Sequence, residues 1–313
     1  MYDLVTVGEV LLRLAVPSPG RIETARQLDV QIGGAEANVA AACARLGARV
    51  AWLSALPANE WGERVRRELS GHGVDCSYVR MTEAARLGLY FLEYGVPPRP
   101  ISVLYDRRDS AFARLRPDEL DWTPVRQARL VHVSGVTAGL GELSRAVVRR
   151  TLAEARVLSY DVNYRARLWS GDEARAFLDE VLPQVHYLFV GEEEARALGF
   201  TGRAEGIVTA LAQRAPDAII AVMRGADGSL VKVGDKLYAP SRRPVVQVVD
   251  PIGAGDAFVA GYLWATLTDR TPESAVDIAD AVAALKCSTW GDVALVTRSD
   301  IDNVLGGRLG VQR

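Results

Sequence analysis

The stretch Asp250-Pro251-Ile252-Gly253-Ala254-Gly255-Asp256-Ala257-Phe258 carries the strongest local signal in this sequence. It follows a valine-rich run, predicted to be a strand over residues 245–249, and it opens an alanine-rich segment predicted to be helical. Gly253 and Gly255 let backbone amides turn inward at a helix start, where free N–H groups and the helix dipole favour anions. Such a loop suits a phosphoryl group, and Asp256 beside it could accept the proton of an attacking hydroxyl. A glycine-rich turn with Asp256 as the helix N-cap would explain the same residues.

Upstream of this stretch, short apolar runs alternate with segments of helical periodicity. This pattern predicts an α/β fold, a three-layer sandwich with a mainly parallel central sheet and helices on both faces. The predicted strands are 4–8, 49–56, 130–134, 157–161, 187–190 and 218–223, and the predicted helices are 35–46, 60–70, 142–155, 172–182 and 205–214. Large α/β units of this length often form one domain, so we expect a single domain over residues 1–313.

Two segments, approximately 11–32 and 87–115, interrupt this alternation. The first has no helical period and contains several prolines and a glycine. In the second, apolar residues alternate as in a β-hairpin, with a proline-rich connection that includes Pro97. We therefore expect a small sheet that projects from the sandwich. A pair of surface loops is the alternative.

The composition excludes several classes of protein. Thirty-seven Lys and Arg against 39 Asp and Glu give a net charge of −2, so no basic excess points to nucleic acid or to an anionic membrane. The sequence contains no uncharged apolar run of ~18 residues and no signal peptide at its N-terminus. The three cysteines have neither metal-binding nor disulfide spacing. We expect a cytoplasmic protein that meets any anionic ligand at a local site.

A second glycine pair, Gly33-Gly34, precedes Asn38 at the start of a predicted helix. Gly34 would let a ligand approach the backbone, and the Asn38 amide can donate and accept, although structural capping would explain both. Together with the stretch at 250–256, this pair resembles the two signature regions of the ribokinase-like (PfkB) carbohydrate kinases, and the resemblance extends over nearly the whole chain. It implies ATP-dependent transfer of the γ-phosphoryl group to a sugar hydroxyl, in a ribokinase-like sandwich with a β-sheet lid formed by 11–32 and 87–115.

The resemblance also implies catalytic roles. By position, Asp256 is similar to the family's catalytic base, and Gly253, Ala254 and Gly255 resemble its anion hole. Many members bind a monovalent cation such as K⁺ near the anion hole, and Asp250 and Ile252 match the positions involved.

Two further regions resemble the nucleotide side of the family. The turn with Arg224, Gly225 and Gly228 looks like its nucleotide-binding loop. Gly191 to Glu194 lies where members carry an N-x-x-E-type motif linked to Mg²⁺ and phosphate. Glu194 matches the acid, whereas Gly191 replaces the usual Asn or Ser, which would weaken nucleotide or metal binding or leave it water-mediated. An acidic first helical turn that complements the helix dipole is the alternative explanation.

Within the family, several strings resemble 2-keto-3-deoxygluconate kinases: Gly88 to Tyr90, Tyr105 to Arg107, Asp161 to Arg165 with Leu168-Trp169, and Trp290 to Thr297. Residues matching Tyr90, Tyr105, Arg107 and Arg165 face the sugar acid in that group. The predicted substrate-binding residues are Gly34, Asn38, Tyr90, Tyr105, Arg107, Asn163, Arg165 and Asp292.

The arginines suit a sugar acid, because a guanidinium meets a carboxylate with two parallel charge-assisted hydrogen bonds. For Arg107, a solvated surface charge is the alternative. Asp106 departs from the residue expected beside such a site, and it would weaken carboxylate binding unless strand alternation from Tyr105 turns it outward.

Several alternatives stay open from sequence. Fructokinase, ribokinase or nucleoside kinase activity would change lid residues without changing the loop at 253–256. A non-catalytic sugar or nucleotide sensor could retain the fold. A dinucleotide-dependent oxidoreductase is disfavoured, because the first βα turn, Gly8-Glu9-Val10, lacks G-x-G-x-x-G. Family members frequently dimerise through the lid, so we expect a homodimer.

Overall fold

The computed structural model describes residues 1–95, 98–242, 244 and 246–307. Its ten-stranded central sheet has the order β14-β13-β12-β11-β10-β9-β1-β4-β5, and β6 pairs with β4. Pairs from β12 to β5 are parallel, whereas β13 and β14 add an antiparallel hairpin at one edge. The strands are β1 (Leu4–Val7), β4 (Val50–Pro57), β5 (Val74–Asp75), β6 (Val79–Thr82), β9 (Leu130–Ser134), β10 (Leu158–Asp161), β11 (Tyr187–Gly191), β12 (Ile219–Met223), β13 (Ser229–Val233) and β14 (Lys236–Tyr238).

Helices cover both faces of this sheet. The helices are α1 (Ala35–Arg45), α2 (Glu60–Gly71), α3 (Thr123–Gln127), α4 (Gly135–Ala138), α5 (Glu142–Glu154), α6 (Gly171–Val181), α7 (Glu192–Ala197), α8 (Ala204–Ala212), α9 (Ala254–Leu267), α10 (Pro272–Cys287) and α11 (Arg298–Leu305). Leu4 packs into the core formed with α1, α2, α9, α10 and α11, while its neighbour Val5 packs into the core on the opposite face, toward α3 and α5. The predicted three-layer α/β sandwich is confirmed.

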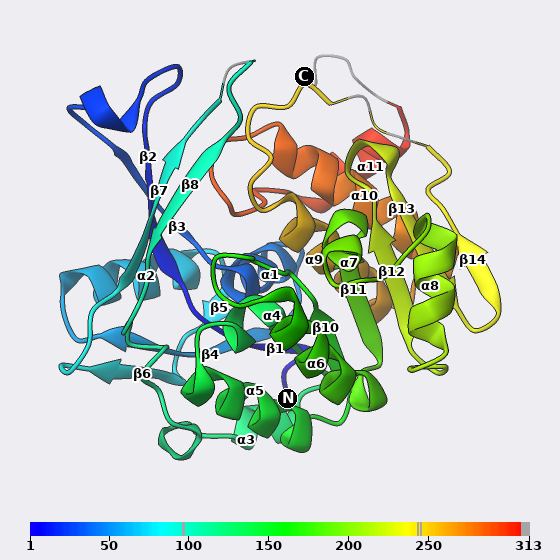
Figure 1. Ribbon diagram of the computed structural model, residues 1–313, viewed down its shortest axis with the longest axis horizontal. Coiled ribbons are helices and arrows are strands. Elements are labelled where there is room, and N and C mark those ends of the chain that lie inside the picture. Colours follow the sequence, from blue (N-terminus) through cyan, green and yellow to red (C-terminus); the bar gives the residue numbers. More distant parts are fainter. Residues whose placement is uncertain (96–97, 243, 245, 308–313) are drawn as a thin grey trace.

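A separate four-stranded sheet projects from the sandwich at the upper left of Figure 1. Its order is β3-β2-β7-β8, formed by β2 (Leu11–Ala15), β3 (Asp29–Gly33), β7 (Gly88–Glu93) and β8 (Ser102–Asp106). The pairs β2–β3 and β7–β8 are antiparallel, whereas β2 and β7 run parallel. The expected small sheet is therefore present. Pro97, in the predicted connection, lies outside the described residues.

Alternation in the small sheet separates its two faces. Tyr90 and Leu92 are buried and lie opposite Tyr105 and Val103 in the register of β7 and β8. Asp106, one residue beyond Tyr105, instead forms an ion pair with Arg86 at the surface. Asp106 therefore points away from the cavity, as strand alternation from Tyr105 allowed.

The strand predicted just before the glycine-rich loop is wrong for its described part, because residues 246–249 form no strand. The amides of Val249 and Asp250 instead donate to the carbonyl of Cys287, at distances of 2.8 and 3.2 Å. The segment is therefore tied to the end of α10, where no strand edge is available, and position 245 lies outside the described residues. Among the described residues, no helix is long and apolar enough to cross a membrane.

Candidate active site

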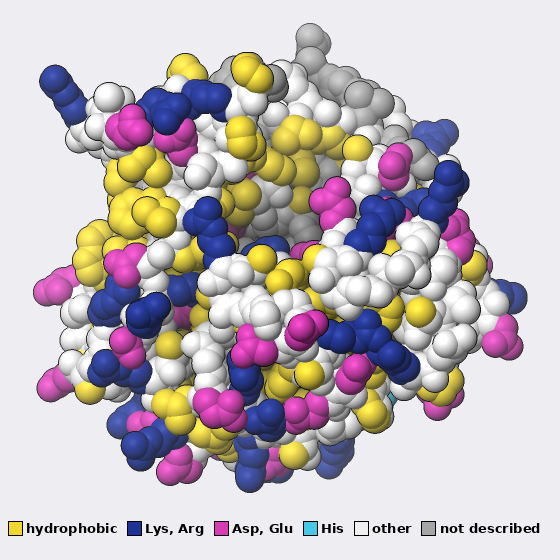
Figure 2. All heavy atoms as spheres, in the orientation of Figure 1, with side chains coloured by type: hydrophobic (Ala, Val, Ile, Leu, Met, Phe, Trp, Pro, Cys, Tyr) yellow, Lys and Arg dark blue, Asp and Glu magenta, His cyan; other side chains and the backbone are white. Residues whose placement is uncertain are grey.

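A cavity of about 660 Å³ lies between the small sheet and the start of α9. Figure 2 shows the molecule hollowed on the side of the small sheet that faces the sandwich. Every predicted substrate-binding residue lines it, together with Ile252, Gly253 and Asp256. Helix α4, which directly follows β9, contributes Val136, and the loop after β10 contributes Asn163, as expected for an α/β sheet that binds ligands beyond the carboxyl ends of its strands.

The start of α9 forms one wall of the cavity. Gly253 is the N-cap residue, with φ of +84°, and a Cβ there would lie 2.2 Å from the backbone oxygen of Asp292. Both the backbone angle and the close approach therefore require glycine. A Cβ at Gly255 would meet no atom within 4 Å, so the first turn of α9 borders open space. Helix starts present N–H groups without intrahelical partners, which makes this wall suited to an anion.

Asp256 is held by two side-chain amides. Asn38 from α1 donates its Nδ2–H to Oδ2 at 2.7 Å, and Asn163 donates to Oδ1 at 3.2 Å. Asn163 follows β10 with a left-handed φ of +38°, a conformation that asparagine tolerates better than most residues. Burial raises the pKa of Asp256 to about 7, although the bond from Asn38 acts in the opposite direction. A carboxyl group with this pKa can accept a proton near neutral pH.

The small sheet forms the opposite wall. Tyr90 donates to the Asp292 carboxylate at 2.7 Å, and the ring centroids of Tyr90 and Tyr105 are 6.0 Å apart. Arg107 is only 8% exposed, and its Nε donates to Oε2 of Glu9 at 2.8 Å. Arg107 is therefore a buried, oriented cation, which excludes the alternative of a solvated surface charge.

Arg165 and Arg167 follow β10 at the mouth of the cavity. The Arg165 side chain is 42% exposed and pairs with Glu194 at 3.5 Å. Arg167 donates to the carbonyl of Val103 in β8, so it bridges the two walls. Arg167 was not among the residues predicted from sequence. The sequence feature that could have identified Arg167 is its position two residues after Arg165, in the same loop beyond a predicted strand.

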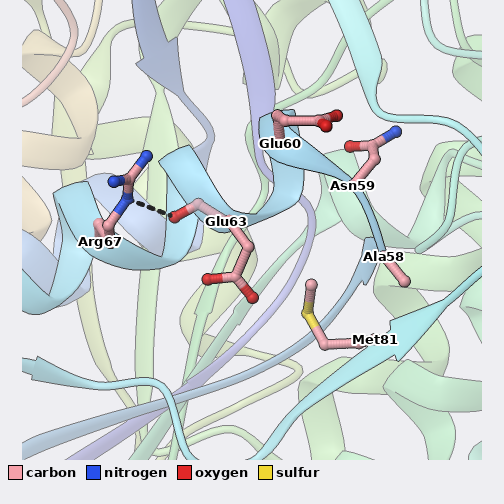
Figure 3. Close-up of a pocket in the computed structure, with 6 residues that line it drawn as sticks. All are labelled: Ala58, Asn59, Glu60, Glu63, Arg67 and Met81. Atoms are coloured by element: carbon pink, nitrogen blue, oxygen red, sulfur yellow. Dashed lines mark hydrogen bonds between the residues drawn. The ribbon is translucent and has the colours of Figure 1, made fainter.

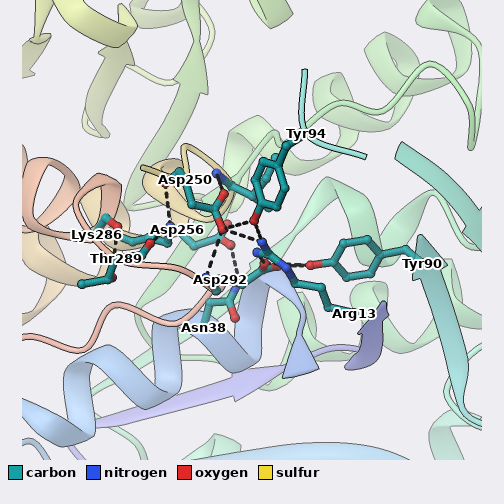
Figure 4. A network of polar contacts seen from close by, with 11 residues as sticks. Arg13, Asn38, Tyr90, Tyr94, Asp250, Asp256, Lys286, Thr289 and Asp292 are labelled. Carbon is teal, nitrogen blue, oxygen red and sulfur yellow. Dashed lines mark hydrogen bonds and ion pairs between the residues drawn. The ribbon is translucent and has the colours of Figure 1, made fainter. Parts of the chain in front are cut away.

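Arg13 was also missed. It lies in β2 but is 1% exposed, and it forms ion pairs with Asp250, at 2.5 Å, and with Asp292. Tyr94 donates to the same oxygen of Asp250 at 2.6 Å. Figure 4 shows these side chains converging from the small sheet and from the loops around α9. The sequence feature that could have identified Arg13 is that it is the one charged residue in the otherwise apolar strand Leu11–Ala15.

The predicted nucleotide-side residues do not line this cavity. Gly191 is the last residue of β11, and Arg224 directly follows the neighbouring strand β12 and donates to the carbonyl of Ser229 at 3.1 Å. Gly225 and Gly228 have φ of +57° and +76° in the turn that leads to β13. The Gly191 amide donates to Oε2 of Glu194 at 3.1 Å. The ion pair between Glu194 and Arg165 is thus the link between these loops and the cavity.

A second hollow, of about 560 Å³, lies at the start of α2 (Figure 3). Its Asn59 oxygen caps the helix by accepting from the amides of Trp61 and Gly62. Arg67 donates to the backbone oxygen of Glu63 at 3.3 Å. None of the predicted site residues lines this hollow.

Comparison with known proteins identifies the family of the chain. The chain is 41% identical to 2-dehydro-3-deoxygalactonokinase of Haloferax volcanii, over 99% of each chain. The crystal structure of 2-dehydro-3-deoxygluconokinase from Thermotoga maritima superposes with a TM-score of 0.90 at 29% identity, covering 98% of this chain and all of the other. A ribokinase II from E. coli, solved with ATP and Mg²⁺, shares the fold, with a TM-score of 0.89 at 19% identity over 98% of this chain and all of that one. The model of the pfkB family of carbohydrate kinases matches residues 1–297, and the chain belongs to this family.

Proposed function

We propose that the protein uses ATP to phosphorylate a 2-keto-3-deoxy sugar acid, either 2-keto-3-deoxygluconate or its galactonate epimer. The observation that carries this proposal is one cavity that joins Asp256, the open first turn of α9, and the side chains of Arg107 and Arg165. The names of the relatives from Haloferax volcanii and Thermotoga maritima support the same substrate class.

In the proposed reaction, Asp256 removes the proton of the sugar hydroxyl as its oxygen attacks the γ-phosphorus of ATP. The new O–P bond forms while the bond from the γ-phosphorus to the β,γ-bridging oxygen breaks, and ADP leaves with that oxygen. Backbone N–H groups of Gly253 and Gly255 would stabilise the charge that spreads over the transferred group. The N–H of Ala254, which donates to the Pro251 oxygen at 3.2 Å, would join them on turning to the phosphoryl group. The pKa of Asp256, at about 7, suits a base that must be unprotonated at neutral pH.

Mg²⁺ is proposed to bind mainly through phosphate oxygens and water, with Glu194 acting indirectly. The described residues contain no group of three or more His, Cys, Asp or Glu side chains that could hold a metal ion. That fits an ion that keeps most of its waters and uses one carboxylate plus substrate phosphates. When bound, it would neutralise charge on the transferred phosphoryl group. Arg224, Gly225 and Gly228, with Gly191, are proposed to contact the nucleotide.

The sugar acid carboxylate is proposed to bind Arg165 and Arg107, with Gly34, Asn38, Asn163, Tyr90, Tyr105 and Asp292 contacting the remaining oxygens. Arg165 offers the more available charge, because Glu9 already accepts from Nε and from a terminal nitrogen of Arg107. A Cβ at Gly34 would lie 2.3 Å from the Glu9 backbone oxygen, so this position too requires glycine for the chain to pass.

We further propose that residues 1–313 form one kinase domain in which segments 11–32 and 87–115 act as a lid and a dimer surface. The outer face of the small sheet presents Leu14, Phe91 and Leu104 in one row across three strands. Leu104 is 54% exposed. Exposed apolar residues on a sheet of this kind favour pairing with a second copy.

The decisive experiment measures ADP release from Mg·ATP with 2-keto-3-deoxygluconate, 2-keto-3-deoxygalactonate, fructose, ribose and adenosine. We expect turnover confined to the two keto acids, and their ratio identifies the preferred epimer. Turnover with a neutral sugar alone would overturn the assignment of a sugar acid. Silence with every compound, while ATP still binds, would overturn the proposed kinase activity and favour a sensor.

A further inference from the structure

Lys286 has an unusual position for a lysine, because its side chain is fully buried behind the loop that leads into α9. It projects from the last turn of α10, and its Nζ donates to the backbone oxygens of Asp250 at 2.8 Å and of Thr289 at 3.4 Å. Figure 4 shows Lys286 beside Thr289 and Asp250, on the side of the loop away from Tyr90. Burying an ammonium group costs free energy unless oxygen acceptors surround it, so this arrangement calls for a role.

The oxygens of Asp250 also decide whether the monovalent cation predicted at Asp250 and Ile252 can bind. A cation such as K⁺ requires carboxylate and carbonyl oxygens that are free to replace its water. The Asp250 carboxylate instead accepts from Arg13 at 2.5 Å, from Tyr94 at 2.6 Å, and from the amides of Ile252 and Gly291, each at 3.0 Å. Its backbone oxygen accepts from Lys286. Protein donors therefore already occupy the Asp250 oxygens, so Asp250 does not fit as a ligand of a bound monovalent cation.

Charge is balanced without an added ion. Arg13 and Lys286 bring two positive charges, and Asp250 and Asp292 bring two negative charges, all within one buried network. Burial lowers the pKa of Lys286, and both carboxylates oppose that shift. The lysine ammonium is a compact point charge with three donors, so it can satisfy several carbonyl oxygens as an inorganic cation would.

The contacts also connect Lys286 to the proposed anion hole. Lys286 holds the backbone oxygen of Asp250, and the next residue, Pro251, accepts the amide of Ala254 at 3.2 Å. Ala254 follows Gly253, whose left-handed φ sets the direction in which α9 starts. A displacement at Asp250 would therefore move the first-turn amides of α9.

We propose that the ammonium group of Lys286 is a built-in monovalent cation: it holds the loop at Asp250 and supplies the positive charge behind the anion hole, so the protein needs no added K⁺. The catalytic part of this inference rests on the proposed kinase function. Lys286 acts here as a positioning residue, because it contacts the loop rather than the reacting atoms.

The test compares wild type with Lys286→Met at matched ionic strength in KCl, LiCl and tetramethylammonium chloride. We measure ADP release, the melting temperature, and the fluorescence of Trp290, whose ring lies 4.7 Å from that of Tyr94. Because the chain has six tryptophans, the Trp290 signal is the difference from the matching Trp290→Phe protein. Lys236→Met, at an exposed lysine of β14, is the matched control. For wild type and the control we expect equal turnover, melting temperature and fluorescence in all three salts.

For Lys286→Met we expect a loss of about tenfold or more in turnover in tetramethylammonium, because a displaced loop misaligns the amides of α9. K⁺, but not Li⁺, should restore part of that loss and raise the melting temperature. A wild type whose turnover or melting temperature rises with K⁺ would overturn the inference, as would a Lys286→Met variant that equals wild type in every salt. If Lys286→Met does not fold, the wild-type salt series still decides.

Failure of the proposed function is distinguishable from failure of this inference. A wild type that phosphorylates no sugar would contradict the kinase assignment, while its melting temperature and Trp290 fluorescence would still report whether K⁺ binds.

Discussion

The two walls of the cavity are built differently. The helix wall, formed by the start of α9 with Asn38 and Asn163, is held by close backbone packing at Gly253 and by amides directed at Asp256. The sheet wall, formed by β7 and β8, belongs to a projecting four-stranded sheet whose outer face is partly exposed. The comparison indicates that the helix wall positions the groups that carry out the proposed reaction. Residues of the sheet wall can differ, and so select another substrate, without displacing those groups. Substitutions should therefore lower turnover on the helix wall and raise KM on the sheet wall.

The largest effect is expected for Asp256→Asn, because removing a general base costs about 10²–10⁴-fold in rate. Turnover should fall within that range while the melting temperature and circular dichroism stay near wild type. Asp302→Asn, at an exposed position of α11, is the control. Near-normal turnover of Asp256→Asn would show that the helix wall does not carry the chemistry.

The next effect separates two glycines of the helix wall. Gly255→Ala should keep its melting temperature, since a Cβ there meets no atom within 4 Å. It should lose roughly 10- to 100-fold in turnover by displacing the transferred group. Gly253→Ala should lose stability as well, because its Cβ would meet the Asp292 backbone oxygen at 2.2 Å. Equal melting temperatures for the two variants would contradict this account of the loop.

The pH dependence tests the same wall without mutation. The pKa of Asp256 is raised to about 7, so the reactive unprotonated form dominates above that pH and is lost below it. We expect log kcat/KM to rise with a slope of about one up to roughly pH 7 and then level off, about tenfold lower at one pH unit below. A flat profile between pH 5 and 8, over a range in which the protein stays folded, would remove Asp256 as the base.

Two arginines of the cavity, Arg165 and Arg107, test recognition of the substrate carboxylate. Arg165→Met should raise KM for the keto acid about 10- to 100-fold, as expected for losing a hydrogen bond between charged groups. Turnover at saturation should change little, and the carboxamide analogue of the substrate should bind both proteins equally. Arg107→Met should also raise KM, but it should lower the melting temperature as well, because it strands the buried carboxylate of Glu9. An equal loss with the carboxamide would exclude recognition of the carboxylate.

The smallest effect on catalysis is expected for Leu104→Glu on the outer face of β8. Sedimentation should show a monomer at micromolar concentration where wild type is a dimer, while kcat stays near the wild-type value. Leu237→Glu, at an exposed leucine of β14 outside the small sheet, is the control for the added charge. A wild type that already sediments as a monomer would contradict the dimer.

Much of this architecture could be predicted from sequence because it depends on local patterns. The parallel strands β1, β4, β9, β10, β11 and β12 lie within a residue or two of the predicted ranges, since each is a short apolar run beside a helical segment, whereas β5 and β6 were not predicted. The strand predicted at 245–249 is wrong for residues 246–249, because a valine run specifies a strand only where it pairs with a neighbouring strand, and here Val249 bonds to the end of α10.

The sequence alone determined the fold class, the position of Asp256 at the start of a helix, and the eight predicted substrate-binding residues that line the cavity, although not Arg167. Tertiary structure alone decided how their charges are used. Arg107 is paired with Glu9, Arg13 lies between two carboxylates, and Lys286 holds the loop at Asp250. These partners are as many as 279 positions apart in the chain. Whether a charge is solvated, paired or available to a ligand depends on burial and on partners that only the folded chain brings together.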